Sequence, residues 1–169
     1  MESTVKLYSL EYNQSKTYLM TTLFVVGNIL LPQLCHLFHQ GGMIWLPIYF
    51  FTLVGAYKYG WKVGLLTAIA SPIVNSLWFG MPAPAMLPII LIKSVILALA
   101  AGFAAKKFGR ISLPILIGVV LTYQILGIFA EWAITGSFYA AAQDFRLGIP
   151  GMAVQILLGY VFINYLIRK

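Results

Sequence analysis

Charged residues are scarce in this sequence. Asp, Glu, Lys and Arg make up 9% of its 169 residues, whereas about a quarter of the residues of a soluble domain are charged. Hydrophobic residues make up 61% of the chain, and the mean hydropathy is +0.90. These values exclude an ordinary soluble domain and predict an integral membrane protein.

Acidic residues are the rarer of the two charge types. The chain has 4 Asp and Glu against 11 Lys and Arg, which gives a formal net charge of +7. The basic residues are scattered over short loops and form no stripe interleaved with exposed aromatic residues, so nucleic acid is not a predicted partner. The lipid bilayer explains their distribution better, because cytoplasmic loops of membrane proteins are enriched in Lys and Arg.

Cysteine and the common catalytic motifs are also missing or rare. Cys35 is the single cysteine, which excludes an internal disulfide and a multi-cysteine metal cluster. The chain has no Walker phosphate-binding loop, no G-x-S-x-G elbow and no His-Glu-x-x-His motif. We therefore expect no enzymatic activity, no cofactor and no metal, and any energy for active transport must come from a partner or an ion gradient.

Long hydrophobic runs are what the chain does have. We predict an all-α integral membrane protein with a short interfacial segment at residues 1–16 and a single six-helix membrane domain at residues 17–169. Most predicted spans contain the roughly 20 residues that cross a hydrocarbon core about 30 Å thick, although the second is shorter. The first is too long for the core of a signal peptide. The predicted spans are residues 17–38, 44–59, 61–79, 86–105, 112–136 and 147–167.

Proline positions support these boundaries. Pro32 and Pro72 lie inside predicted spans, where each should bend its helix and free a backbone carbonyl that a neighbouring group has to satisfy. The other prolines near span boundaries fall in opening turns, where the missing N–H costs nothing. These are Pro47, Pro88, Pro114 and Pro150.

Basic residues sort to one side of the predicted bundle. Six crossings place both termini on the same face, and the positive-inside rule makes that face cytoplasmic. Arg146 lies on the outer side, together with Asp144, and Lys93 lies inside a span. The residues predicted on the cytoplasmic side are Lys6, Lys16, Lys58, Lys62, Lys106, Lys107, Arg110, Arg168 and Lys169.

Lys93 and Glu131 are ionisable residues inside the fourth and fifth predicted spans. Lys93 lies about 10 Å below the outer boundary at a rise of 1.5 Å per residue, and a lysine at a helix centre costs about 3 kcal/mol to insert. Glu131 lies at a similar depth and is the only acid within a span. Three interpretations are open: an ion pair between the two, contact with a polar substrate, or snorkelling toward the interface.

Other polar and aromatic residues gather at the outer end. His36 and His39 stand one turn apart and fit hydrogen bonding to a ligand, a wet interfacial position or, with two copies of the chain, a haem clamp. Without a third ligand they make a weak metal site. The outer tryptophans fit an aromatic belt or stacking on a flat ring, and the amides fit ligand binding or helix association. The predicted substrate-binding residues are His36, His39, Gln40, Asn75, Trp78, Lys93, Glu131, Trp132 and Gln155.

Several segments carry a resemblance to a known family. They are residues 39–42 (HQGG), 46–48 (LPI), 64–72 (GLLTAIASP) and 79–84 (FGMPAP). The pattern G-L-x-x-x-x-x-S-P followed by G-M-P is fairly specific. The chain resembles the substrate-binding S component of an energy-coupling-factor (ECF) vitamin transporter, in the branch that includes pantothenate, hydroxymethylpyrimidine and cobalamin binders.

The resemblance implies a function. A six-helix protein in the plasma membrane of a prokaryote would capture a small water-soluble vitamin or precursor from outside, and residues 38–44 would close over it. It would then dock on a membrane scaffold protein with two ATPase subunits and deliver the ligand inward. One departure is the first helix, where Thr22 and Val26 stand in place of the A-x-x-x-A docking pattern.

Two other functions fit the residues. One is a stand-alone ion-coupled carrier that uses Glu131 as its proton site. The other is a haem- or quinone-binding membrane anchor that uses His36 and His39. For a binding subunit, Lys93 favours a ligand with a carboxylate such as pantothenate, whereas Trp78 and Trp132 favour a heterocycle such as a pyrimidine or pyridine.

Overall fold

The computed structural model describes residues 6–166, which fold into helices without a β-sheet. A 3₁₀ turn at Pro47–Tyr49 and a π-helical turn at Phe162–Leu166 supplement the α-helices. The α-helices in chain order are α1 Ser15–Cys35, α2 Gly41–Trp45, α3 Phe50–Tyr59, α4 Trp61–Phe79, α5 Leu87–Phe108, α6 Leu113–Thr135, α7 Phe138–Ala141, α8 Gln143–Leu147 and α9 Ile149–Val161.

Helix length and hydropathy identify a multi-span membrane protein. Within residues 6–166, the helices α1, α4, α5 and α6 are each long and apolar enough to cross a bilayer. The pair of segments Phe138–Leu147 and Ile149–Tyr165 is a fifth candidate, although the chain bends by 48° between them. The prediction of an all-α protein with several spans is confirmed at this level.

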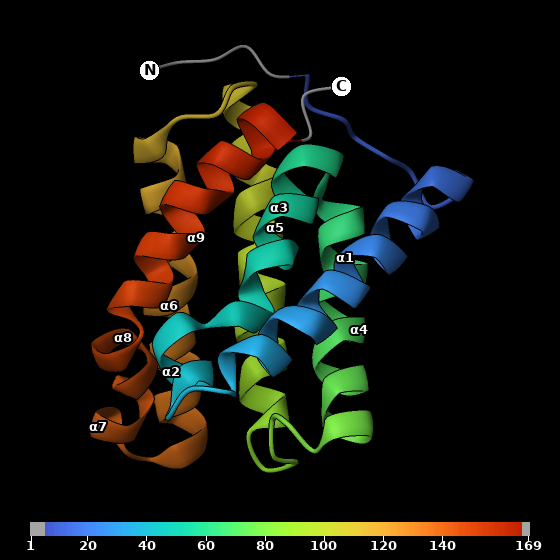
Figure 1. Ribbon diagram of the computed structural model, residues 1–169. Coiled ribbons are helices and arrows are strands. Elements are labelled where there is room, and N and C mark those ends of the chain that lie inside the picture. Colours follow the sequence, from blue (N-terminus) through green and yellow to red (C-terminus); the bar gives the residue numbers. More distant parts are fainter. Residues whose placement is uncertain (1–5, 167–169) are drawn as a thin grey trace.

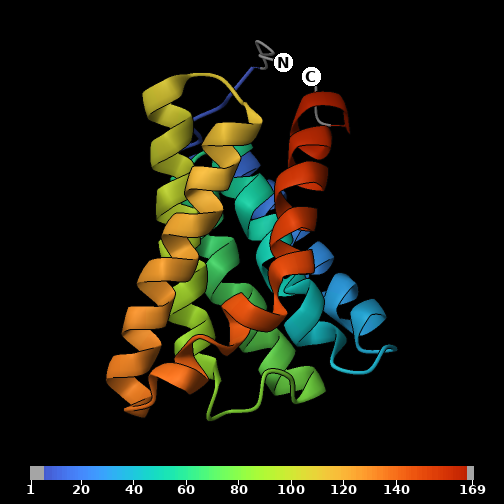
Figure 2. The same ribbon diagram turned by 90° about the vertical axis from the view of Figure 1, so that its left-hand side faces the viewer.

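Helix α3 lies at the centre of the bundle. It packs against α1, α4, α5 and α9, and nearly all of its side chains are buried. Figure 1 shows α1 crossing the others obliquely, and Figure 2 shows the longer helices running roughly along one axis. Close approach depends on glycine: a Cβ on Gly64 would lie 2.7 Å from the Cα of Ala56, and one on Gly102 would lie 2.8 Å from the Cα of Trp61.

The structure divides the second predicted span, residues 44–59. Helix α3 has 10 residues, about 15 Å at 1.5 Å per residue, which is half the thickness of the hydrocarbon core. The first part of this range contains the end of α2, a break at Leu46 and the 3₁₀ turn, because Pro47 lacks an N–H and Leu46 has a φ of 47°. The expectation of one continuous helix over this range is therefore wrong.

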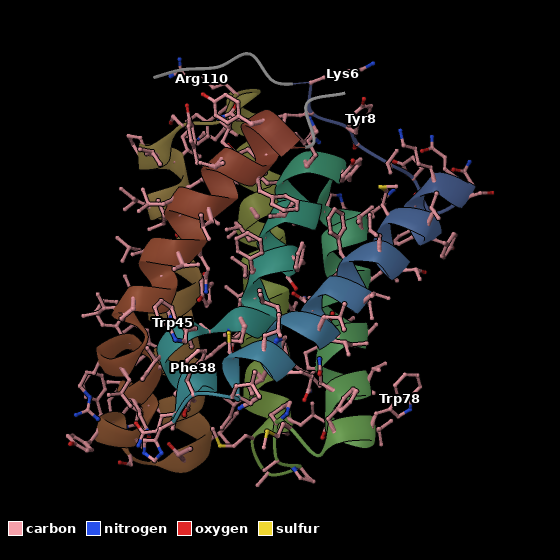
Figure 3. The ribbon with its side chains drawn as sticks, viewed as in Figure 1. Lys6, Tyr8, Phe38, Trp45, Trp78 and Arg110 are labelled. Carbon is pink, nitrogen blue, oxygen red and sulfur yellow. The ribbon has the colours of Figure 1, made fainter. Side chains whose placement is uncertain are left out.

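The two ends of the bundle differ in chemistry. Figure 3 shows Lys6 and Arg110 at one end and Phe38, Trp45 and Trp78 toward the other. We call the first the basic end and the second the pocket end. Helices α2, α7 and α8 lie at the pocket end (Figure 1). Of the nine basic residues predicted on one side, Arg168 and Lys169 fall outside the described residues.

The N-terminal segment is pinned to the basic end. The amides of Tyr8 and Leu10 donate to the carbonyls of Lys58 (2.8 Å) and Tyr59 (3.0 Å) at the end of α3. Glu11 forms an ion pair with Lys62 at the start of α4. These contacts give residues 6–14 a fixed path without helical structure. The part of the predicted interfacial segment at residues 1–5 lies outside the described residues.

A buried polar network joins α1, α3 and α4. Pro32 cannot donate to the Asn28 carbonyl, and the Asn75 side chain supplies the missing hydrogen bond at 2.9 Å. The Asn28 amide group donates to Thr52 and Ser71, and its oxygen accepts from the Phe51 amide at 3.1 Å. The prediction that a neighbouring group satisfies the carbonyl freed by Pro32 is confirmed.

Candidate functional site

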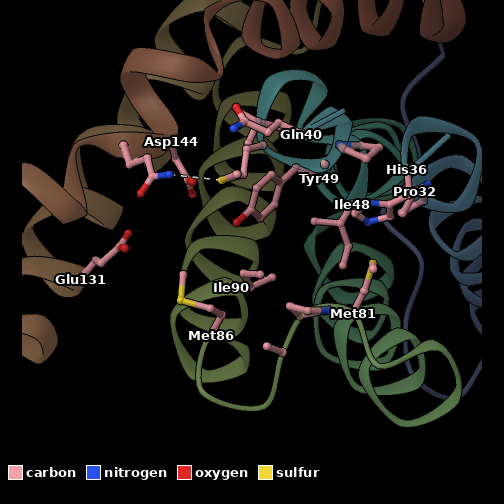
Figure 4. Close-up of a pocket in the computed structure, with 17 residues that line it drawn as sticks. Pro32, His36, Gln40, Ile48, Tyr49, Met81, Met86, Ile90, Glu131 and Asp144 are labelled. Atoms are coloured by element: carbon pink, nitrogen blue, oxygen red, sulfur yellow. Dashed lines mark hydrogen bonds between the residues drawn. The ribbon is translucent and has the colours of Figure 1, made fainter. Parts of the chain in front are cut away.

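A cavity of about 390 Å³ opens at the pocket end. Its walls come from the end of α1, α2, the 3₁₀ turn, the loop between α4 and α5, the start of α5, the end of α6, and α8 (Figure 4). Small-molecule sites fall between about 300 and 1,000 Å³, are mostly apolar, and carry a few convergent polar groups. This cavity matches that description.

Most of the wall is apolar. Three methionines, Met43, Met81 and Met86, line it together with Ile48 and Ile90. Thioethers are polarizable and flexible, and they make favourable contacts with aromatic rings. The Gln143 side chain donates to the sulfur of Met43 at 3.3 Å, the contact drawn as a dashed line in Figure 4. The wall therefore suits an organic molecule with a flat apolar body.

An ion triad lies beside the cavity. The ammonium of Lys93 on α5 is 2.6 Å from Oε2 of Glu131 on α6 and 2.6 Å from Oδ2 of Asp144 on α8. Lys93 is fully buried, whereas both carboxylates contribute to the cavity wall. The ion pair, one of the three interpretations of Lys93 and Glu131, is thus present, and Asp144 is added to it.

Gly127 makes room for this triad. It precedes Glu131 by one turn on α6, and a Cβ at this position would lie 2.7 Å from Cγ of Lys93. The Lys93 stem therefore crosses the bare backbone of α6 to reach the carboxylate on the same helix face. The absence of a side chain at residue 127 is a geometric condition for the triad.

Helix α2 forms part of the cavity wall. Its flanking residues Gln40 and Leu46 have left-handed backbone conformations, with φ values of 54° and 47°, which non-glycine residues seldom adopt. The imidazole of His36 packs on Gly42, where a Cβ would lie 2.7 Å from Cε1. The expected lid at residues 38–44 overlaps this helix, and Gln40, Gly42 and Met43 line the cavity.

The side chain of Gln155 holds the end of α2 in place. Gln155 on α9 donates to the Leu46 carbonyl at 3.4 Å and accepts from the Tyr123 hydroxyl at 3.1 Å. The ring of Tyr123 lies 5.2 Å from that of Tyr49, a cavity residue. Gln155 is buried, and its role is to donate a hydrogen bond to the backbone carbonyl at the break between α2 and the 3₁₀ turn.

The predicted site residues fall into two groups. His36, Gln40 and Glu131 line the cavity. The others do not: Lys93 is buried behind the carboxylates, Asn75 and Gln155 belong to buried hydrogen-bond networks, and His39 lies on the exposed loop before α2. The residues that the structure does not bring to the cavity are His39, Asn75, Trp78, Lys93, Trp132 and Gln155.

The tryptophans project away from the cavity. Trp78 is 75% exposed, and Figure 3 shows it at the periphery of the bundle. Trp132 is 45% exposed and packs edge-to-face on Phe138, with ring centroids 5.6 Å apart. These positions fit the aromatic-belt interpretation. A flat ligand in the cavity would therefore meet methionines and Tyr49 rather than indole rings.

Sequence reasoning missed several cavity residues. Asp144 was placed at the outer end without a connection to Lys93, because 51 positions separate them. The methionines and Tyr49 gave no signal, since isolated apolar residues at span ends are common. Charge counting gave no signal either, because the two acids at that end, Glu131 and Asp144, are matched in number by Lys93 and Arg146.

No metal centre is evident in the described part of the chain, residues 6–166. It contains no group of three or more His, Cys, Asp or Glu side chains placed to hold an ion. His36 lines the cavity and His39 does not.

Comparisons with protein-family models, with curated proteins and with solved structures gave no match for this chain. Its function must therefore be inferred from the cavity itself.

Proposed function

We propose that this chain is the membrane-embedded binding subunit of an importer for a small water-soluble vitamin or vitamin precursor, of the ECF S-component type. The observation that carries the proposal is the cavity of about 390 Å³ at the pocket end, opposite the basic end. Under the positive-inside rule the basic end is cytoplasmic, so the cavity opens to the outside of a prokaryotic plasma membrane.

The proposed topology has six crossings with both termini in the cytoplasm. In it, α3 with α2 and the 3₁₀ turn form the second crossing, and α9 with the π-turn forms the sixth. Support comes from the alternation of helix direction and from the lysines at the basic end. The divided second crossing is compatible with a bilayer because α3 is enclosed by α1, α4, α5 and α9.

Transport requires partners in this proposal. The chain has no nucleotide-binding loop, so a membrane scaffold protein and two ATPase subunits would supply the energy. Within the chain, α2 is the element suited to gating, since it covers the cavity and left-handed residues flank it. The division of labour is then capture by this chain and release by the assembled complex.

The test is retention of a small molecule by the purified protein. Native mass spectrometry of the wild type in mild detergent is expected to reveal a bound compound. Ile90→Trp, which fills the cavity, should remove it. Leu99→Trp, nine positions further along α5 and 46% exposed, should keep it. A wild-type protein that retains no compound and binds no water-soluble vitamin or precursor would contradict the proposal.

A second candidate is a stand-alone ion-coupled carrier. The Lys93, Glu131 and Asp144 triad favours it, because buried ionisable clusters in membranes often carry protons or ions. Uptake by liposomes that contain only this chain separates the two candidates. A carrier accumulates substrate when an ion gradient is imposed, whereas a binding subunit does so only when scaffold and ATPases are added.

A further inference from the structure

We propose that the cavity selects a small organic cation, whose amine or protonated ring nitrogen meets Glu131 and Asp144. This inference rests on the proposed function, because it names the chemical class of the ligand. The ligand body would lie against the methionines, and the charged group would point toward the two carboxylates.

The triad carries an excess of negative charge. One ammonium and two carboxylates form the triad, so one negative charge is left without a counter-charge. Both carboxylates line the cavity, whereas Lys93 is fully buried behind them. The charge that a ligand meets is therefore opposite in sign to the one that Lys93 alone suggests.

Each carboxylate of the triad uses only one of its oxygens to bind Lys93. Lys93 occupies Oε2 of Glu131 and Oδ2 of Asp144. Within residues 6–166, neither Oε1 of Glu131 nor Oδ1 of Asp144 accepts a hydrogen bond from the protein. A carboxylate has about four acceptor positions, so each retains capacity for a donor on the ligand. An amine would provide such donors, and an anion would not.

Among the residues that the structure describes, the cavity wall holds no lysine or arginine that would compete with a cationic ligand. Arg146, which is close in sequence to Asp144, is directed elsewhere: it donates to the Tyr139 carbonyl at 3.1 Å and lies 3.7 Å from the centre of that ring. The two carboxylates lie on one side of the cavity and His36 lies on the other (Figure 4).

These observations also define the role of Lys93. It holds two carboxylates together that would otherwise repel each other, and it binds only one oxygen of each, Oε2 of Glu131 and Oδ2 of Asp144. Lys93 is thus a positioning residue for the ligand site. An anionic ligand would have to approach two carboxylates without reaching the ammonium, which disfavours it strongly.

The test uses three ring compounds that differ in charge. Binding of benzylammonium, benzyl alcohol and benzoate to the full-length protein in detergent is measured by ligand-observed NMR. The wild type is expected to prefer benzylammonium over benzoate by at least about tenfold, the effect of a well-placed counter-charge. Glu131→Gln or Asp144→Asn, which leaves one carboxylate for Lys93, should remove the preference, and the double variant should reverse it.

Two results for the wild type and one for the double variant would overturn the inference. Benzoate binding as tightly as benzylammonium in the wild type, or no benzylammonium binding at millimolar concentration, would overturn the inference. So would a preference that the double variant leaves unchanged. The proposed function is tested separately. If the compound that the purified protein retains in native mass spectrometry is an anion, the proposal of a binding subunit is supported and the proposal of a cationic ligand is contradicted.

Discussion

Among residues 6–166 two lysines are buried, Lys58 toward the basic end and Lys93 toward the pocket end, and the protein stabilises them differently. Lys58 at the basic end donates to the backbone carbonyl of Lys6 at 2.6 Å, and its ammonium lies 5.6 Å from the centre of the Tyr8 ring. In residues 6–166 no carboxylate forms an ion pair with it. Lys93 has two carboxylates at 2.6 Å.

The difference shows what each lysine is for. The ammoniums of Lys6 and Lys16 also lie close to the Tyr8 ring, at 5.2 and 4.6 Å from its centre, which is cation–π geometry. That cluster fits anchoring at a membrane surface, where water and lipid headgroups complete the solvation of the exposed Lys6 and Lys16, while Lys58 is buried beneath them. Lys93 lies deep in the bundle and needs counter-charge from the protein. Two acids supply more than it needs, and the surplus faces the cavity.

Removal of Lys93 should have the largest effect. Lys93→Met leaves two carboxylates side by side without a counter-charge, so we expect the unfolding free energy to fall by about 3 to 5 kcal/mol. Thermal unfolding in detergent measures it. The triple variant Lys93→Met, Glu131→Gln, Asp144→Asn should recover most of the loss. An unchanged melting temperature for the single variant would mean that the triad does not form.

The Asn75→Ala variant tests how much a buried, uncharged hydrogen bond contributes to stability. Asn75→Ala should cost about 1 to 3 kcal/mol, because the Asn28 carbonyl loses its donor inside the bundle. Pro32→Ala supplies a backbone N–H to the same carbonyl, so Asn75→Ala should cost less in that background. Additive losses in the double variant would show that Asn75 acts by another route.

Gly127 tests the path of the Lys93 stem. Gly127→Ala places a methyl group 2.7 Å from Cγ of Lys93, and overpacking of this kind costs about 1 to 3 kcal/mol. Gly118→Ala on the same helix is the matched control, because a Cβ there meets no atom within 4 Å. Equal melting temperatures for the two alanine variants would contradict the packing described.

Lys58 should give the smallest effect. Lys58→Met removes one hydrogen bond to a carbonyl, which is worth about 1 kcal/mol, and it leaves no carboxylate uncompensated. The same thermal unfolding assay should therefore show a loss well below that of Lys93→Met. Comparable losses for the two variants would remove the distinction between an anchoring lysine and a charge-balanced one.

The sequence predicted what depends on local hydropathy. The third predicted span coincides with α4, and the first, fourth and fifth differ from α1, α5 and α6 by a few residues at their ends, because a bilayer selects apolar length directly. The break at Leu46 was not predictable, since a left-handed leucine follows from tertiary contacts such as the one from Gln155.

The site was predictable only in part. Lys93 and Glu131 were identifiable because ionisable residues inside spans are rare. Asp144 was not paired with them, because the course of α7 and α8 brings it back and no sequence periodicity reports that path. Trp78 and Trp132 are aromatic residues at span ends, which is typical of a binding rim. The helix face that each occupies decides where its ring lies, and both rings are exposed on the surface of the bundle.

The central claim is that the cavity opens to the outside and the lysine cluster faces the cytoplasm. Labelling with a membrane-impermeant thiol reagent tests it most directly, in a Cys35→Ser background. Leu37→Cys, which is 78% exposed at the pocket end, should react in intact cells. Lys107→Cys, exposed at the basic end, should react only after the cells are opened. The reverse pattern would turn the cavity toward the cytoplasm and contradict the account.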